Sequence, residues 1–152
     1  MSGRSANRGE CAQYCRLPYT MVDATGTEIV SNKHLLSLKD MNRSDQLEAL
    51  LDAGVSSLKI EGRLKDAGYV KNITAYYRKK LDAVLSRRPE YRRASAGRST
   101  YTFEPVAEKS FNRGFTPFLL EGRTADITAF NTPKSLGEPV GTVKAVSYTH
   151  LR

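Results

Sequence analysis

Cys11 and Cys15 are the residues of this chain whose type and spacing most directly suggest chemistry. Three residues separate them, whereas a typical zinc-binding pair has two, and a zinc site would need further ligands from a chain with only His34 and His150. Nearby arginines favour the thiolate form, which is the form that binds an iron–sulfur cluster. Neither histidine is close to the cysteines in sequence, where it could serve as a base. A ligand role therefore explains the two cysteines better than nucleophilic catalysis does.

Two predicted strands each end in charged residues. Lys39 and Asp40 follow the first strand, and Glu61 and Arg63 close the second. In parallel barrels the side chains at the carboxyl ends of the strands form the catalytic site. We therefore expect these four residues to line a barrel mouth and to act in catalysis. The alternative is a structural ion pair, Lys59–Glu61 or Glu61–Arg63, that only orders the rim of the barrel.

The formal net charge of +8 favours a polyanionic partner. Part of this charge surrounds the cysteines, and part follows the long predicted helix. The arginines that we expect to contact nucleic-acid phosphates are Arg4, Arg8, Arg16, Arg87, Arg88, Arg92 and Arg93. A solvated basic surface without a dedicated partner explains the same charge, and charge alone does not separate RNA from DNA.

Residues 1–88 are predicted to alternate between strands and helices. The predicted elements, in order, are a hairpin of 19–22 and 28–30, a strand at 34–38, a helix capped by Ser44 and stopped by Gly54, a strand at 55–61 and a helix at 66–85. This βαβα order indicates an α/β fold with parallel strands covered by helices. Two such units cannot enclose a sheet, so we expect an incomplete part of a larger fold. Tyr69, Tyr76 and Tyr77 of the long helix are expected to pack rather than to stack on bases.

A basic stretch, residues 87–98, contains proline and glycine and marks the predicted boundary of a second part. Residues 89–145 are predicted to begin a β-rich domain. Its expected strands are 100–104, 127–130 and 139–145. Residues 146–152 fit neither part and resemble the translated end of a sequencing adapter. The underlying DNA record tests that hypothesis, because unrelated coding sequence at this point would remove it.

The composition is typical of a globular protein in water, with 39% hydrophobic and 26% charged residues. No apolar run approaches the roughly 20 residues of a membrane helix, and residues 1–15 lack the apolar core of a signal peptide. Two cysteines do not suggest a disulfide framework. These features predict a cytoplasmic location and no membrane partner, and they leave the oligomeric state open.

Several segments, in order along the chain, resemble the collagenase-like peptidases, family 32 of the peptidases of unknown catalytic type. These segments are Gly3–Tyr19 around the cysteines, Leu36–Met41, Ser57–Asn72, Ala94–Arg98, Glu108–Gly114 and Pro139–Val143. The resemblance spans nearly everything from Ser2 to Ala145. Within the family, the arrangement is most similar to the branch that forms 5-hydroxycytidine in ribosomal RNA.

The resemblance implies the C-terminal part of a TIM-like barrel followed by the start of a β-rich domain. It also implies an iron–sulfur enzyme that hydroxylates large-subunit ribosomal RNA without molecular oxygen and with a prephenate-derived co-substrate. By position, Cys11 and Cys15 match two ligands of a four-iron four-sulfur cluster, and the other ligands are missing here. Asn42 stands where some relatives have a further cysteine. The isolated fragment is therefore expected to be inactive.

Two other functions remain open at this point. A peptidase acting on collagen-like or other peptides, as the family name says, requires a nucleophile or activated water that these residues do not identify. A non-catalytic RNA-binding module predicts RNA binding with a steep salt dependence and no iron. Iron and sulfide analysis of the full-length protein separates the hydroxylase from both.

Overall fold

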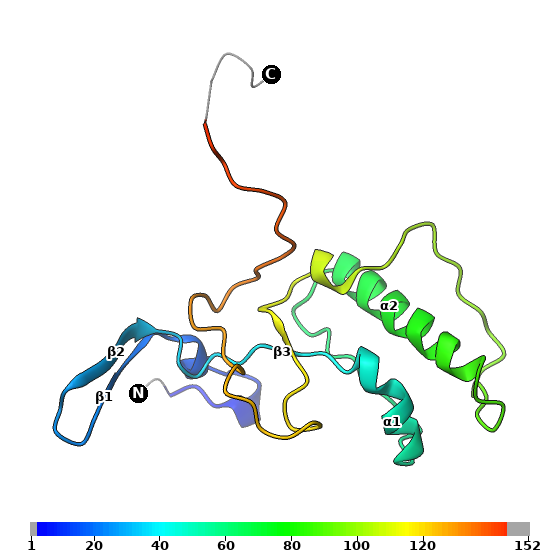
Figure 1. The fold of residues 1–152 in the computed structure, drawn as a ribbon, viewed down its shortest axis with the longest axis horizontal. Coiled ribbons are helices and arrows are strands. Elements are labelled where there is room, and N and C mark those ends of the chain that lie inside the picture. The colour runs from blue at the N-terminus through cyan, green and yellow to red at the C-terminus, as the bar shows by residue number, and fades with distance from the viewer. Residues whose placement is uncertain (1–2, 146–152) are drawn as a thin grey trace.

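The computed structural model describes residues 3–145, so the proposed adapter-derived segment 146–152 lies outside the described residues. A β-hairpin extends from one side of the molecule, and two helices lie together on the other side (Figure 1). Irregular segments connect them, and the chain runs away from this body as it approaches residue 145 (Figure 1). None of the helices within residues 3–145 has the length and hydrophobicity needed to cross a membrane.

The hairpin consists of strand β1, Tyr19–Val22, and strand β2, Glu28–Lys33, which pair antiparallel. The Asp23 carboxylate closes the turn, because its Oδ1 accepts the backbone N–H of Thr25 at 2.8 Å and that of Thr27 at 2.9 Å. Gly26 supplies the positive φ of 88° that the turn requires. The predicted hairpin is confirmed, with a second strand that runs three residues further than predicted.

The first helix, α1, spans Leu47–Asp52 and follows a single 3-10 turn, Ser44–Gln46. The prediction that Ser44 caps this helix is wrong. Neither the 3-10 turn nor α1 has a side-chain cap, and Asn42 Oδ1 accepts the Ser44 backbone N–H at 3.0 Å ahead of the turn. Gly54 ends the helix as predicted: its φ is 84°, and its N–H bonds to the Leu51 carbonyl at 2.9 Å.

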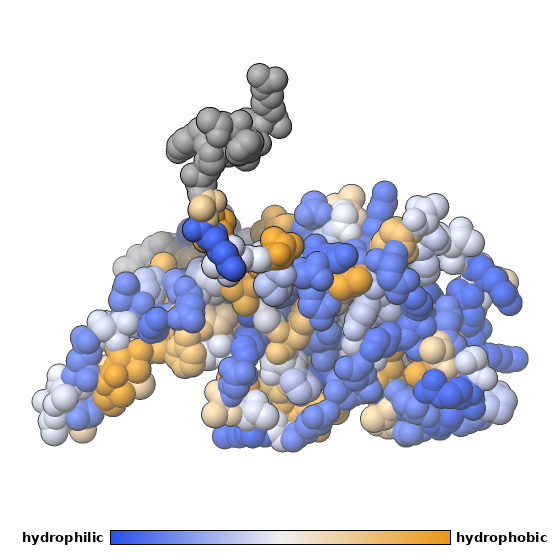
Figure 2. Space-filling model, turned by 45° about the horizontal axis from the view of Figure 1, so that its top comes forward, coloured by the Kyte–Doolittle hydropathy of each residue, from blue (hydrophilic) through white to orange (hydrophobic). Residues whose placement is uncertain are grey.

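The long helix, α2, spans Ala67–Leu85 and agrees with the predicted range. Asp66 caps it, because its Oδ1 accepts the Tyr69 backbone N–H at 2.7 Å. Helices α1 and α2 contact each other. The buried apolar side chains of the structure are Leu47, Ile73, Ala75, Val84, Ala107 and Ala129. This core is small, and many larger apolar side chains are exposed. Hydrophobic patches lie scattered among hydrophilic residues on the face shown in Figure 2.

The two strands predicted before the helices are not formed as predicted. Residues 34–38 contain a turn, and the strand begins later, as β3, Asp40–Met41. Residues 55–61 have no strand partner among the described residues, and Leu58 is 45% exposed. Apolar alternation marks a segment that is able to form a strand, but the strand also needs a neighbouring backbone to hydrogen-bond with.

Strand β3 pairs in parallel with β4, Phe115–Thr116, which the sequence did not predict. Residues 127–130, which were predicted as a strand, run antiparallel to the chain before β3. Ala129 donates its N–H to the Ser37 carbonyl at 2.6 Å, and Lys39 donates to the Ile127 carbonyl at 2.9 Å. This backbone pairing crosses the predicted domain boundary.

The remaining predicted strands, at 100–104 and 139–145, are irregular in the structure. Within residues 3–145, the strands form two sheets of two strands each. Among the described residues, the second part pairs with the first through β4 and Thr128, and it contains one antiparallel bridge of its own, between Leu119 and Gly122. The β-rich domain stays a prediction. The TIM-like barrel stays a prediction.

Candidate active-site pocket

A pocket of about 460 Å³ opens between β3, α1, α2 and the irregular segment 58–61. Its volume lies in the range of small-molecule sites. The charged and phenolic side chains that line it are Asp40, Arg43, Lys59, Glu61, Lys65, Tyr69, Tyr77 and Arg113. Leu47, Leu50 and Ile73 contribute an apolar wall. The pocket combines hydrogen-bond donors and acceptors with an apolar surface, which suits a ligand with both polar and apolar parts.

Asp40 is held in place by Arg113, 73 residues further along the chain. Asp40 Oδ2 accepts the Arg113 backbone N–H at 2.8 Å and its Nε at 3.3 Å, and Arg113 Nη2 bonds to the other carboxylate oxygen. The Asp40 side chain is 27% exposed and the Arg113 side chain 17%. Such a two-pronged contact fixes both the position and the plane of a carboxylate. Asp40 is therefore a rigid acceptor at the pocket wall.

The loop that carries Arg113 is organised around Asn112, which is 3% exposed. The Asn112 side-chain amide donates to the carbonyls of Glu108 at 2.9 Å and Ser110 at 3.0 Å, and its oxygen accepts the Gly114 N–H at 3.1 Å. The sequence assigned no role to Arg113. The signal was present, because Glu108–Gly114 is one of the segments that carry the family resemblance.

Lys39 lies on the other side of the backbone from Asp40. Its Nζ forms an ion pair with Asp126 Oδ2 at 2.5 Å, and it lines a different hollow together with Gly114 and Phe130. Adjacent residues of an extended chain face opposite ways, which explains the separation. The structure therefore places Asp40 and Glu61 in one pocket and Lys39 outside it.

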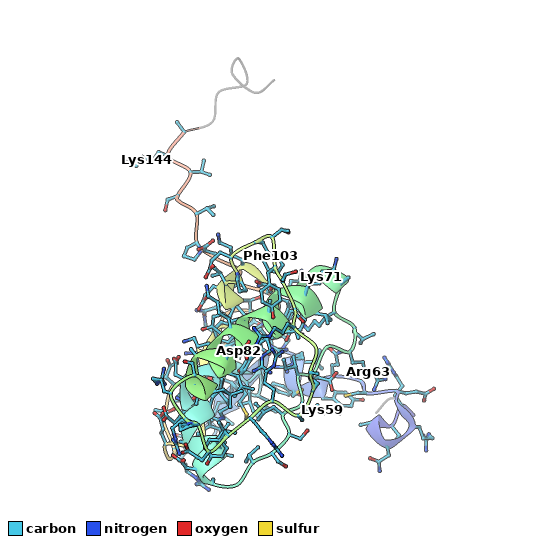
Figure 3. The ribbon with its side chains drawn as sticks, turned by 90° about the vertical axis from the view of Figure 1, so that its right-hand side faces the viewer. Lys59, Arg63, Lys71, Asp82, Phe103 and Lys144 are labelled. Carbon is cyan, nitrogen blue, oxygen red and sulfur yellow. The ribbon has the colours of Figure 1, made fainter. Side chains whose placement is uncertain are left out.

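Glu61 lines the pocket, and Arg63 connects the pocket to the cysteine loop. Glu61 Oε1 accepts the backbone N–H of Arg63 at 2.6 Å. The Arg63 side chain extends toward the N-terminal segment (Figure 3), where its Nη2 donates to the Gly9 carbonyl at 3.4 Å. The side-chain ion pairs considered for Lys59, Glu61 and Arg63 are not formed among the described residues.

Lys65 and Tyr69 are pocket residues that the sequence did not single out for chemistry. Lys65 Nζ lies 3.0 Å from the centroid of the Phe111 ring and 5.6 Å from that of Tyr69. Burial lowers the pKa of the Lys65 ammonium, and the nearby Asp40 charge partly opposes that effect. Burial raises the pKa of the Tyr69 phenol, with the negative charge of Asp40 as the second cause.

The cysteine loop, residues 9–16, is anchored by Arg16. Arg16 Nη1 donates to Ser37 Oγ at 2.8 Å and to the Leu38 carbonyl at 3.3 Å. The Arg16 carbonyl lies 3.0 Å from His34 Nδ1. These contacts hold the loop against the segment that leads into β3, and His34 has a structural role in them.

Both cysteines are exposed and unpaired. Cys11 Sγ accepts the backbone N–H of Gln13 at 3.4 Å, and Gln13 adopts the left-handed φ of 54°. A four-iron four-sulfur cluster needs about four ligands. Among residues 3–145, no group of three or more metal-binding side chains comes together. The thiols, with an N–H donated to sulfur, fit two ligands of such a cluster and no more.

Among the predicted phosphate-binding arginines, Arg87 and Arg88 form hydrogen-bonded ion pairs with carboxylates. Arg88 bonds to Glu48 at 2.9 Å, to Asp52 at 2.5 Å and to Glu90 at 2.5 Å, and Arg87 bonds to Glu48 at 3.3 Å. Hydrogen bonds to Asp52, then Glu48, raise the pKa of Arg88, and the same bonds lower the pKa of each carboxyl. Arg88 thus ties the chain after α2 to α1.

The other arginines predicted to contact phosphates differ in the hydrogen bonds and ion pairs that they form. Arg16 is committed to its loop, and Arg8 Nη2 donates to the Gly3 carbonyl at 3.2 Å. Arg93 Nε lies 4.0 Å from Asp82. Arg4 and Arg92 are exposed and form no hydrogen bond or ion pair within the described part of the chain. Arg92 and Arg93 line one cavity, apart from the Asp40 pocket.

Comparison with known proteins gives a family and several relatives. The sequence profile described as "Peptidase family U32" matches residues 1–129. The chain is 53% identical over 150 residues to the 23S rRNA 5-hydroxycytidine C2501 synthase of Escherichia coli, covering 99% of this chain and 23% of that protein.

More distant relatives carry two kinds of name. The chain is 38% identical over 112 residues to a collagenase of Porphyromonas gingivalis, covering 73% of this chain and 29% of that protein. It is 35% identical over 89 residues to the tRNA hydroxylation protein P1 of Bacillus subtilis, covering 55% of this chain and 21% of that protein. The chain spans about a quarter of the length of the curated relatives it matches. No solved structure matches it.

Proposed function

Because the chain belongs to peptidase family U32, we propose that it is part of an iron–sulfur-dependent hydroxylase that forms 5-hydroxycytidine in large-subunit ribosomal RNA. The observation that carries this proposal is the 53% identity, over 99% of the chain, to a 23S rRNA 5-hydroxycytidine synthase. The name of the tRNA hydroxylation protein supports RNA as the substrate class. An enzyme acting on ribosomal RNA would work in the cytoplasm.

The charged lining of the pocket supports recognition of a cytosine base. Cytosine presents an exocyclic amine that donates hydrogen bonds and a carbonyl that accepts them, and carboxylates are its usual partners at the amine. Glu61 would accept from the amine, while Lys65 or Lys59 would donate to the carbonyl oxygen. Arg113 keeps Asp40 oriented at the wall. The base would enter by leaving its stack, as it does in other enzymes that modify bases.

The cysteine loop would hold the cluster beside this pocket. Cys11 and Cys15 would supply two thiolates, and the remaining ligands would come from outside this chain. When bound, the cluster would supply the electron transfer that replacing the C5–H bond by C5–OH demands. Arg16 and Arg63 would fix the distance between loop and pocket through Ser37 and Gly9. A prephenate-derived co-substrate remains part of this proposal, with its carboxylates matched by the basic groups of the pocket.

A peptidase is the second candidate, because one relative is named a collagenase at 38% identity. The described residues give it less support. A peptidase requires a nucleophile or an activated water, and His34 Nδ1, a candidate base, already lies 3.0 Å from the Arg16 carbonyl. A hydroxylase needs neither a base at the cysteines nor a water-activating metal in the pocket.

The deciding experiment uses a strain that lacks the full-length gene. Wild-type full-length protein should restore 5-hydroxycytidine, measured by mass spectrometry of ribosomal RNA, and Cys11→Ala should not. Glu10→Gln is the matched control, because Glu10 is exposed in the same loop. Restoration by Cys11→Ala to the wild-type level would exclude the cluster role. Proteolysis by a purified protein that lacks both cysteines would favour the peptidase.

A further inference from the structure

A second cavity, of about 470 Å³, lies between the end of α1, the C-terminal half of α2 and residues 91–95. Three arginines line it: Arg78 from α2, and Arg92 and Arg93 from the segment after that helix. No acidic side chain is among the lining residues, and none of them also lines the Asp40 pocket. This arginine cavity is therefore a separate, positively charged site.

The arginine cavity carries more positive charge than its surroundings neutralise. Asp82, on α2 (Figure 3), bonds to Arg78 Nη2 and lies 4.0 Å from Arg93 Nε. Arg92 is exposed and has no carboxylate partner within residues 3–145. One carboxylate thus faces three guanidinium groups, and two positive charges are left over. An anion in the cavity would be attracted by both.

Two donors in this arginine cluster are buried without a partner. Arg78 Nε and Arg93 Nε form no hydrogen bond among the described residues. A buried donor that stays unsatisfied costs free energy, and such groups usually face a ligand or another polar atom. Guanidinium groups match the oxygens of a phosphate in both geometry and charge. The unsatisfied donors therefore favour a phosphate as the anion.

The rest of the cavity wall is apolar and aromatic. Leu51, Leu81 and Leu85 line it together with Tyr91. The Tyr91 ring is fixed, because its hydroxyl donates to Asp52 Oδ1 at 3.4 Å and the Arg88 guanidinium carbon lies 5.2 Å from its centroid. Fixed aromatic rings are the surfaces on which unpaired bases stack. A cavity with positive groups for a phosphate and a fixed ring for a base fits a nucleotide.

We propose that the arginine cavity binds one unpaired nucleotide of the RNA substrate. Its phosphate lies on Arg78, Arg92 and Arg93, and its base lies against Tyr91. The identity of the polyanion as RNA rests on the proposed function. The site anchors the strand away from the Asp40 pocket, so it contributes binding and takes no part in the chemistry.

The test compares two full-length variants that lose the same charge. Arg92→Gln removes an unpaired arginine of the cavity, and Arg123→Gln removes an exposed arginine outside it. Binding to a labelled single-stranded RNA of about ten nucleotides is measured by fluorescence anisotropy at several salt concentrations. Arg92→Gln should weaken binding about fivefold to tenfold and reduce the salt slope by about 0.7, while Arg123→Gln should leave both nearly unchanged. Equal effects of the two variants would overturn the proposal.

A second measurement locates the contact directly. RNA carrying photoreactive 4-thiouridine should crosslink to the peptide that contains residues 91–95, and Arg92→Gln should reduce that product. Binding without any crosslink at this peptide would also overturn the proposal. Measuring 5-hydroxycytidine separately distinguishes the two claims. Binding at the cavity without hydroxylation would contradict the proposed function alone, and hydroxylation without binding at the cavity would contradict this inference alone.

Discussion

The Asp40 pocket and the cysteine loop carry the two kinds of chemistry proposed for this protein, and they are built differently. The pocket is organised by contacts within the chain, since Arg113 holds Asp40 and buried Asn112 holds the loop of Arg113. The cysteine loop is anchored at Arg16, while both thiols stay exposed. The chain therefore preorganises a pocket by itself, whereas under the proposed function it would supply only part of the cluster site.

The strongest way to separate the two regions is to remove the thiols. The double substitution Cys11→Ala and Cys15→Ala should abolish bound iron and 5-hydroxycytidine in the full-length protein, because two of about four ligands are lost. Hydrogen exchange at the backbone amides of Asp40 and Arg113 should not change, since neither cysteine contacts them. Iron analysis and hydrogen-exchange mass spectrometry check both parts, and iron retained by the variant would contradict the assignment.

The reverse experiment disrupts the Asp40 pocket and leaves the cysteine loop unchanged. Arg113→Ala should lower the hydroxylation rate about 100-fold, because a misplaced wall residue misplaces the substrate. It should also lower the free energy of unfolding by about 2 kcal/mol through the lost charged hydrogen bonds. Arg113→Lys should recover only part of the rate, since an ammonium lacks the two-pronged geometry. Iron content should stay at the wild-type level, and exposed Arg123→Ala is the control.

The pH dependence of the hydroxylation rate tests the electrostatic environment of the Asp40 pocket. Burial lowers the pKa of Lys65 from its ordinary 10.5, so this amine loses its proton earlier than a free lysine as the pH rises. Hydroxylation that needs the protonated amine should decline on the alkaline side. Lys65→Arg should move that decline to higher pH, because arginine stays charged. Lys71→Arg, at an exposed lysine of α2 that does not line the pocket, should leave the profile in place. An unchanged profile in Lys65→Arg would remove the role of this amine.

The smallest effect is expected at the ion pairs that join α1 to the chain after α2. Hydrogen bonds to Arg88 lower the pKa of Glu48, so its contribution to stability is present above the unfolded pKa, near 4.3, and is lost as the pH falls through the folded pKa. Because the Glu48 side chain is 41% exposed, Glu48→Gln should cause only a slight loss of thermal stability at pH 7. The difference from wild type should vanish near pH 3. A difference that persists there would have another cause.

The motifs predicted the family, and the comparison confirms it. They also selected Asp40 and Glu61, which the structure brings into one pocket, but they grouped Lys39 with them. Arg113 was missed although its segment resembled the family. Nothing in a linear pattern shows that an arginine 73 residues away will meet Asp40. Similarly, the basic charge after α2 predicted a set of free arginines, and the structure pairs Arg88 with three carboxylates.

The sequence by itself determined the elements whose hydrogen bonds are local. The turn at Asp23, the cap at Asp66 and the stop at Gly54 depend on residues within four positions of one another, so their patterns are readable along the chain. The tertiary structure alone decided where strands form and which charges meet. Strand β3 exists because β4 lies beside it, and residues 55–61 remain irregular because no described strand does. A strand takes its hydrogen bonds from another segment, and the identity of that segment is a long-range property.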